Sequence, residues 1–143
     1  MILAGGAEEA DVYSIDLTHE EVTWTSENDF LSALGKRGFD LEPIPCGGTD
    51  PIDEQREQWT DGANAFAVAP GVIICYDRNE RTADELSRHG YEVVRDDDLL
   101  LGRTSVDGRG GRKYAIQLST TELARARGGP RCMTMPLVRE RLR

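Results

Sequence analysis

The sequence predicts a mixed α/β fold, with residues 1–143 forming a single domain. Apolar and polar residues alternate over residues 11–17, which is the two-residue period of a half-buried strand. Residues 64–76 contain two β-prone runs separated by a Pro-Gly pair, an arrangement typical of a hairpin. A helical pattern at 82–89 and a strand-like run at 91–95 follow. This order of elements favours ββαβ units in mixed sheets over a doubly wound parallel sheet.

The first half of the chain adds one helix to the strand at its start. Ser26 and Asp29 approximate a capping box, and the apolar residues after them recur on one helical face. We therefore expect a helix over residues 27–37 that Gly38 ends. Residues 41–45 are expected to be short and extended, because each proline there disfavours helix for the residue before it. A loop rich in glycine, aspartate and proline then leads to the hairpin.

The second half of the chain is expected to continue with a helix and two more strands. Thr82 and Glu85 form a capping box that opens the helix after the hairpin. The second strand of the hairpin is apolar enough to be central in a sheet. Residues 96–111 are polar and rich in glycine, which predicts a connection without regular structure. An alternating strand at 113–118 and a short helical turn at 120–126 complete the predicted elements.

Composition excludes several classes of function. The formal net charge of −9 repels phosphate backbones, and the two Arg-Gly-Gly stretches occur once each, so we expect no nucleic-acid partner. The same charge would attract a cationic small molecule, but it is also an ordinary means of staying soluble. The apolar runs are far shorter than the roughly 20 residues that span a bilayer, and no secretory leader pattern is present. We expect no membrane partner and a cytoplasmic location.

The cysteines offer one candidate nucleophile. Three cysteines form no Cys-x-x-Cys pair and only two histidines accompany them, so neither a disulfide framework nor a metal site is expected. Cys75 lies in an apolar strand and Cys46 beside two glycines, which favours structural roles for both. Cys132 follows two glycines, a proline and an arginine, and Arg127 and Arg131 could stabilise its thiolate. A nucleophilic and a structural interpretation of Cys132 both remain open at this point.

Other polar residues give weaker signals. Asp61 and Asn64 flank a Gly-Ala pair, and the usual role of such residues is to hold a turn. His19 is expected in a surface turn or at a helix start. His89 precedes Gly90, where it would meet the negative end of the preceding helix. Neither histidine is a convincing general base.

Four segments, in order, resemble the arginine deiminase family. They are Arg-Glu-Gln-Trp-Thr-Asp-Gly-Ala-Asn at 56–64, Ala-Pro-Gly-Val at 69–72, Tyr-Asp-Arg-Asn at 76–79, and Glu-Leu-Ala-Arg-Ala-Arg-Gly-Gly-Pro-Arg-Cys-Met-Thr-Met-Pro at 122–136. Four matches in the family's order make coincidence improbable. The last segment is the most specific, because it contains the residue that matches the family's nucleophile, Cys132.

The resemblance implies a fold and a reaction. The fold would be a partial α/β propeller (pentein) of about two ββαβ blades, corresponding to the C-terminal part of arginine deiminase. The reaction would convert L-arginine and water into L-citrulline and ammonia through a cysteine thiouronium intermediate, with no metal or organic cofactor. Cys132 would be catalytic. Arg127 would bind substrate, since the matching loop of the family lies over it.

The sequence departs from the family at one decisive point. A guanidinium must be held by carboxylates while an acid–base group moves protons, and the family uses a His-x-Asp motif for part of this. No His-x-Asp occurs in these 143 residues, and the family places that motif upstream of the matching segment. We therefore expect an isolated chain to be inactive and to require an upstream arginine deiminase portion or self-association.

Two other interpretations remain open. The chain could be a non-catalytic binding or regulatory domain derived from arginine deiminase, in which the glycines persist because the fold needs them. It could also be an unrelated small α/β binding module, which would make the four ordered matches coincidental. An adjacent reading frame that encodes the His-x-Asp portion would favour the split enzyme.

Overall fold

The computed structural model describes residues 1–5, 7, 10–18, 20–119, 123–126 and 128–138, and it confirms the mixed α/β class. The described strands are β1 (Ile2–Leu3), β2 (Val12–Asp16), β3 (Thr23–Glu27), β4 (Ile44–Pro45), β5 (Phe66–Ala69), β6 (Val72–Tyr76), β7 (Tyr91–Arg95) and β8 (Lys113–Leu118). The described helices are α1 (Phe30–Gly35), α2 (Pro51–Trp59), α3 (Glu80–Arg88), α4 (Asp96–Leu100) and the 3₁₀ turn η1 (Leu123–Ala126).

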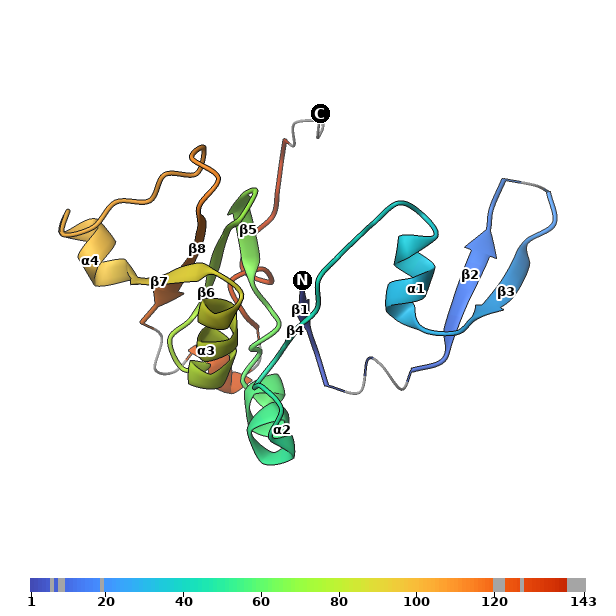
Figure 1. Cartoon of the computed structure of the whole chain (residues 1–143), viewed down its shortest axis with the longest axis horizontal. Helices are drawn as coiled ribbons and strands as arrows, with labels where there is room; N and C mark the ends of the chain where they lie inside the picture. Colours follow the sequence, from blue (N-terminus) through green and yellow to red (C-terminus); the bar gives the residue numbers. More distant parts are fainter. Residues whose placement is uncertain (6, 8–9, 19, 120–122, 127, 139–143) are drawn as a thin grey trace.

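A four-stranded mixed sheet, which we call the central sheet, forms the larger of the two parts of the molecule seen in Figure 1. Its order is β5-β6-β8-β7, with β5 and β6 antiparallel and β8 parallel to both of its neighbours. The predicted hairpin is confirmed, and Gly71 has the positive φ of 75° that its tight turn requires. The second hairpin strand, β6, lies inside the sheet as expected.

Two apolar clusters cover the faces of this sheet. On one face Cys75 and Ala115 pack with Leu86 of α3 and Ile44 of β4. On the other face the buried residues are Val72, Val94, Tyr114 and Ile116, and Leu99 of α4 and Val106 pack against them. Burial on both faces explains why β6 and β8 have continuous apolar runs rather than a strict alternation.

A second, smaller unit consists of the β2–β3 hairpin and α1, which Figure 1 shows apart from the central sheet. Lys36 and Arg37, just after α1, form ion pairs with Glu27 of β3, so the end of α1 is held to this side of the hairpin. On the opposite side Ile15 lies directly across from Trp24, and these side chains are 58% and 75% exposed. The hairpin therefore has one apolar face that the described residues leave uncovered.

The start of the first helix was predicted wrongly. Ser26 and Glu27 belong to β3, because they pair with Tyr13 and Val12 of β2 across the hairpin. The helix begins at Phe30, where the Asp29 carboxylate accepts the N–H of Ser32 at 2.8 Å as an N-cap. It ends at Gly35, and Gly38 follows in a turn with φ of 83°.

Two short helices were missed. Residues expected to form a loop contain α2, whose N-cap Asp50 accepts the N–H groups of Ile52 and Asp53 and whose first residue is proline. Residues expected to form an unstructured connection begin with α4, and its three aspartates lie in the first turn, where the helix dipole favours them.

Two further boundaries differ from expectation. Helix α3 begins at Glu80 rather than at a Thr82 capping box, and Thr82 lies inside it. Of the helical turn expected at 120–126, the structure describes the 3₁₀ turn at 123–126, and residues 120–122 lie outside the described set. No helix within the described ranges is both long enough and apolar enough to cross a bilayer.

Candidate active site around Cys132

Cys132 lies on a tight turn near the end of the chain. Its N–H donates to the carbonyl of Gly129 at 3.1 Å, and the N–H of Met133 donates to the same carbonyl at 3.3 Å. The hydroxyl of Thr134 donates to the Arg131 carbonyl at 2.9 Å, which closes the turn on its other side. The cysteine is exposed, so the turn presents its sulfur at the surface.

Gly128 anchors this turn to the rest of the fold. Its N–H donates to the Asp61 carboxylate at 2.6 Å, and its carbonyl accepts the hydroxyl of Tyr76 at 3.1 Å. Burial raises the pKa of Tyr76, and the charges of Asp61 and Cys132 raise it further, so the phenol keeps the proton that it donates. Both backbone groups of Gly128 are thus fixed by side chains from distant parts of the sequence.

Asn64 contacts the sulfur itself. Its side-chain Nδ2 lies 2.7 Å from Cys132 Sγ. Gly129 lies against the same asparagine so closely that a Cβ on the glycine would stand 2.5 Å from Asn64 Cβ. Glycine is therefore required at position 129, three residues before Cys132, because the two segments approach too closely there for a side chain.

Residues 61–64 form a turn that is itself fixed. Asp61 has a φ of 60°, which is unusual for a residue other than glycine but tolerated by aspartate. Its carbonyl accepts the N–H of Asn64 at 2.9 Å. A Cβ on Gly62 would lie 2.7 Å from Cys46 Sγ. The turn expected at Asp61 and Asn64 is present, but a backbone bond closes it. The two side chains, expected to hold this turn, bond instead to the distant cysteine turn, a role that had no signal in the local sequence.

Glu57 is a buried carboxylate that the sequence did not single out. Its side chain is 1% exposed and accepts the N–H groups of Arg81 and Thr82, each at 2.8 Å. These donors belong to the first turn of α3, whose N-cap Asn79 makes no side-chain capping bond. Glu57 thus caps α3 from another helix and satisfies donors that the local sequence leaves open.

Asn79 adds a second tie between the same two regions. Its Oδ1 accepts the hydroxyl of Thr60 at 2.5 Å, and its Nδ2 donates to the Thr60 carbonyl at 3.2 Å. These bonds hold the C-terminal end of α2 against the turn between β6 and α3. The α2 end in turn leads directly to Asp61 and Asn64, so the network fixes the residues that hold the Cys132 turn.

An open concavity of about 440 Å³ borders the sulfur. Its lining residues come from the N-terminal segment, α2, the 61–65 segment and the cysteine turn, and they are Ala4, Gln58, Asp61, Ala63, Asn64, Ala65, Arg131 and Cys132. Among these, Asp61 provides the one carboxylate, and it already accepts the Gly128 N–H. Within the described part of the chain, no cluster of three or more His, Cys, Asp or Glu side chains could hold a metal ion.

Comparison with known proteins assigns the chain to a family. The family model of arginine deiminase matches residues 7–139. The chain belongs to the arginine deiminase family.

Similar curated arginine deiminases come from several bacteria. The enzyme of Listeria welshimeri is 40% identical over 136 residues, that of Limosilactobacillus reuteri 42% over 130 and that of Latilactobacillus sakei 37% over 143. These alignments cover 94%, 90% and 98% of this chain but 28%, 25% and 29% of the relatives. The chain thus spans little more than a quarter of the length of these arginine deiminases.

The segments that resemble arginine deiminase meet at the cysteine turn. The first provides Glu57, Asp61 and Asn64, and the third provides Tyr76, whose hydroxyl holds the Gly128 carbonyl. The fourth provides Cys132 and the glycines before it. The remaining segment, at 69–72, forms the hairpin turn between β5 and β6. The first segment thus contacts the sulfur through Asn64, the third holds the turn that carries it through Tyr76, and the fourth contains it.

The other cysteines, and the arginines and histidines considered in the sequence, have structural positions or lie outside the described residues. Cys46 and Cys75 are buried, and burial raises the pKa of both thiols, that of Cys75 to about 12. Arg131 lines the concavity, but its guanidinium donates to the Thr134 carbonyl at 3.3 Å. Arg127 and His19 lie outside the described residues. The C-terminal position expected for His89 on α3 is confirmed, with its Nδ1 2.8 Å from the Glu85 carbonyl oxygen.

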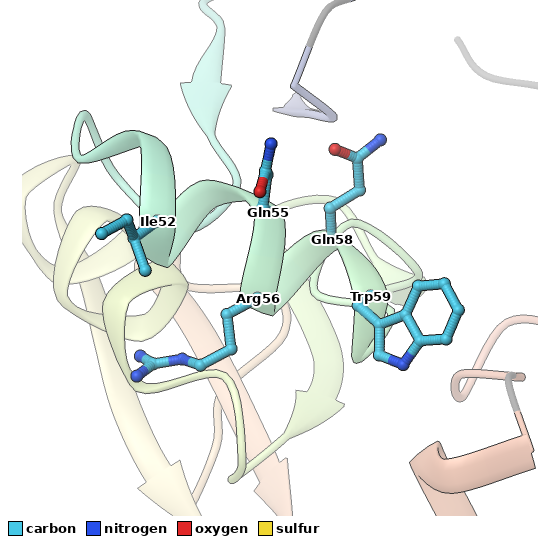
Figure 2. A pocket seen from close by; sticks show the side chains of 5 residues that line it. All are labelled: Ile52, Gln55, Arg56, Gln58 and Trp59. Carbon is cyan, nitrogen blue, oxygen red and sulfur yellow. The ribbon is translucent and has the colours of Figure 1, made fainter.

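A second concavity lies along the outer surface of α2. Ile52, Gln55, Arg56, Gln58 and Trp59 line it. Figure 2 shows Gln55 and Gln58 extending from the side of α2 away from Arg56, with Trp59 at the C-terminal end of the helix. None of these five side chains is a nucleophile, so the concavity beside Cys132 is the better candidate for catalysis.

Proposed function

We propose that this chain contributes the nucleophile of an arginine deiminase-type reaction, the hydrolysis of L-arginine to L-citrulline and ammonia. In this proposal it is a C-terminal fragment or subunit that lacks the His-x-Asp part of the site. The observation that carries the proposal is the exposed Cys132 on a turn held by Asp61, Tyr76 and Asn64, beside an open concavity. A cysteine with only a packing role would not need to be presented in this way.

The proposed chemistry begins with attack of the Cys132 thiolate on the guanidinium carbon. A carbon–sulfur bond forms, a proton is transferred to one terminal nitrogen, and the carbon–nitrogen bond breaks with release of ammonia. The product of this half-reaction is a thiouronium that joins the substrate to the cysteine. Water then adds to the same carbon, the carbon–sulfur bond breaks, and citrulline and the thiolate are released together with two protons. One of these protons restores the group that protonated the leaving nitrogen, and the other is the net proton of the reaction. No metal or organic cofactor takes part.

The site on this chain needs further groups to complete that chemistry. A guanidinium remains protonated and delocalised, so carboxylates must hold it while another group moves protons. Among the described residues that line the concavity, the one carboxylate is engaged by Gly128. We propose that an upstream arginine deiminase portion, or another copy of the chain, supplies the missing groups. The complete assembly would be a cytoplasmic α/β propeller, with residues 1–143 as one C-terminal unit of about two blades.

Arg127 is proposed to bind the substrate, on the basis of the resemblance alone. In an assembled enzyme, Arg127→Ala should lower turnover with arginine while leaving folding nearly intact, because the resemblance implies a loop over the substrate rather than a core position. Substitutions outside the core usually change stability by no more than about 0.5 kcal/mol. A large fall in melting temperature would instead make Arg127 structural.

A non-catalytic binding or regulatory role is the second candidate. It is favoured by the same shortage of carboxylates around the sulfur in the described part of the site. In this case the glycines would persist for packing, as Gly129 does against Asn64. The two candidates differ in whether any complement restores turnover.

The deciding experiment measures citrulline release from arginine. The pure chain is assayed first, then the chain mixed with an upstream arginine deiminase fragment that carries His-x-Asp, each beside Cys132→Ala. We expect no enzymatic rate from the chain alone, since positioned acid–base groups typically contribute about 10²–10⁴-fold, and Cys132-dependent activity in the mixture. Robust turnover by the chain alone would overturn the incomplete-site proposal. Absence of citrulline release in the mixture would favour the non-catalytic role.

A further inference from the structure

We propose that Asn64 is a positioning residue that holds the Cys132 sulfur as a thiolate by donating a side-chain N–H to it. This inference rests on the proposed function, because it concerns the nucleophile of the same site. Asn64 lies 68 positions before Cys132 in the sequence, in a segment whose pattern indicates only a turn, so no local pattern pointed to this role.

The geometry fixes Asn64 relative to the sulfur from two sides. Its backbone N–H is tied to the Asp61 carbonyl at 2.9 Å, which places the residue at the end of a closed turn. Gly129 lies against its Cβ and backbone carbonyl, with no space for a further side-chain atom between them. The 2.7 Å contact between Nδ2 and Sγ therefore lies where the 61–64 turn and the cysteine turn hold each other, through Asp61 and Gly128 as well as through Asn64 and Gly129.

The orientation of the amide matches an anionic sulfur. A thiolate can only accept hydrogen bonds, and Nδ2 can only donate them, so this pair is complementary. A neutral thiol is only a weak acceptor, so the bond from Nδ2 is stronger when the sulfur is a thiolate. The Oδ1 atom of the same amide is buried without a partner among the described residues. The orphaned oxygen costs free energy, which a charge-assisted bond from Nδ2 to the sulfur offsets.

Within the described residues, no hydrogen bond or ion pair joins a charged side chain to the Cys132 sulfur. The Arg131 guanidinium is directed to the Thr134 carbonyl, and the Asp61 carboxylate is held by the Gly128 N–H. An amide donor has a further advantage over a cation at this position, because it adds no positive charge that would repel an incoming guanidinium.

The test is the pH dependence of Cys132 alkylation by iodoacetamide in the complete chain, with mass spectrometry to resolve the three cysteines. The variants are Asn64→Leu, which removes the donor and keeps a branched side chain of similar shape, and Asn64→Ala, which removes the amide and keeps the Cβ that Gly129 lies against. In both, the midpoint of the rate–pH profile should rise by about one pH unit, equivalent to about 1.4 kcal/mol. Gln58→Ala is the matched control, because Gln58 lines the same concavity but its amide donates to the Gly5 carbonyl, and its midpoint should not move.

Unchanged midpoints in cooperatively folded Asn64 variants would overturn the inference. A second measurement uses the wild-type chain and so does not depend on the folding of a variant. By NMR, the side-chain amide resonances of Asn64 should change with pH with the same midpoint as Cys132 alkylation. Resonances that stay constant through that midpoint would also overturn it. Alkylation requires no turnover of arginine, so failure of this inference and failure of the proposed reaction can be told apart.

Discussion

Single side chains that bridge distant segments determine where Cys132 lies. Glu57, Asp61, Asn64 and Tyr76 each bond to a partner at least 24 positions away along the chain. Their chemical types were visible in the sequence, but a local pattern reports only on near neighbours. The resemblance to arginine deiminase pointed to Cys132, whereas the donors and acceptors around it became evident only from the fold.

Glu57→Gln should destabilise the chain by about 2 kcal/mol. The substitution keeps the volume but turns an amide NH₂ toward one of the two α3 N–H donors, which leaves that buried donor unsatisfied. Urea unfolding followed by circular dichroism measures the change. Gln55→Ala, at an exposed position on the same helix, is the control and should stay within about 0.5 kcal/mol. Equal stability of Glu57→Gln and wild type would show that α3 does not depend on this cap.

The buried thiol of Cys75 makes stability depend on alkaline pH. Burial, reinforced by the Asp77 charge, raises its pKa from an ordinary 9.0 to about 12. Below the lower value both folded and unfolded states keep the proton, so Cys75 contributes no pH dependence there. As the pH rises further, the unfolded state loses the proton first, and the free energy of unfolding should fall by about 2 kcal/mol between about pH 9 and about pH 11.

Urea titrations of wild type and Cys75→Ala at several alkaline pH values isolate this contribution from those of the tyrosines. The variant should lose less stability over the interval, whatever its stability at neutral pH. Parallel curves for the two proteins would contradict the assignment of the effect to Cys75.

At the scale of elements, the sequence predicted strands better than short helices. The β5–β6 hairpin was accessible because a Pro-Gly turn separates two apolar runs, and the fold confirms it. Helix α2 was missed because its apolar residues, Ile52 and Trp59, are exposed and give no core-facing stripe. Its capping signal, Asp50 followed by proline, could have revealed it. The misplaced start of α1 reflects pairing with β2, a tertiary effect that overrides local propensity.

The uncovered face of the β2–β3 hairpin should mediate association. A large exposed apolar surface usually marks an interface, and Ile15 and Trp24 form its centre. The wild-type chain should self-associate in sedimentation velocity and bind a hydrophobic dye, while the Ile15→Ser and Trp24→Ser double variant should do both less.

Leu100→Ser is the control for this comparison, because Leu100 at the end of α4 is 81% exposed but belongs to a different surface. Its association should match the wild type. A monomeric wild-type chain over a wide concentration range, without dye binding, would rule out the hairpin as an interface for self-association.

At the scale of the whole molecule, the order of strands was beyond prediction from the sequence. The predicted succession β5, β6, α3, β7 is present, but β8 enters between β6 and β7 after a connection of 17 residues, from 96 to 112. Long-range pairing of this kind leaves no local trace in the sequence. It nevertheless fixes the ends of β6 and β8, and thereby Tyr76, whose hydroxyl holds the cysteine turn.

In the proposed function, Cys132 forms a covalent bond with arginine only when a complementary arginine deiminase portion is present. The most direct measurement is acid quenching of the chain with arginine during turnover, with and without the upstream fragment, followed by mass spectrometry of the peptides. We predict an adduct with the mass of arginine less ammonia on the Cys132 peptide in the mixture alone. Two results would contradict the proposed role of Cys132. One is turnover in the mixture that leaves Cys132 unmodified and persists in Cys132→Ala, and the other is an adduct on Cys46 or Cys75.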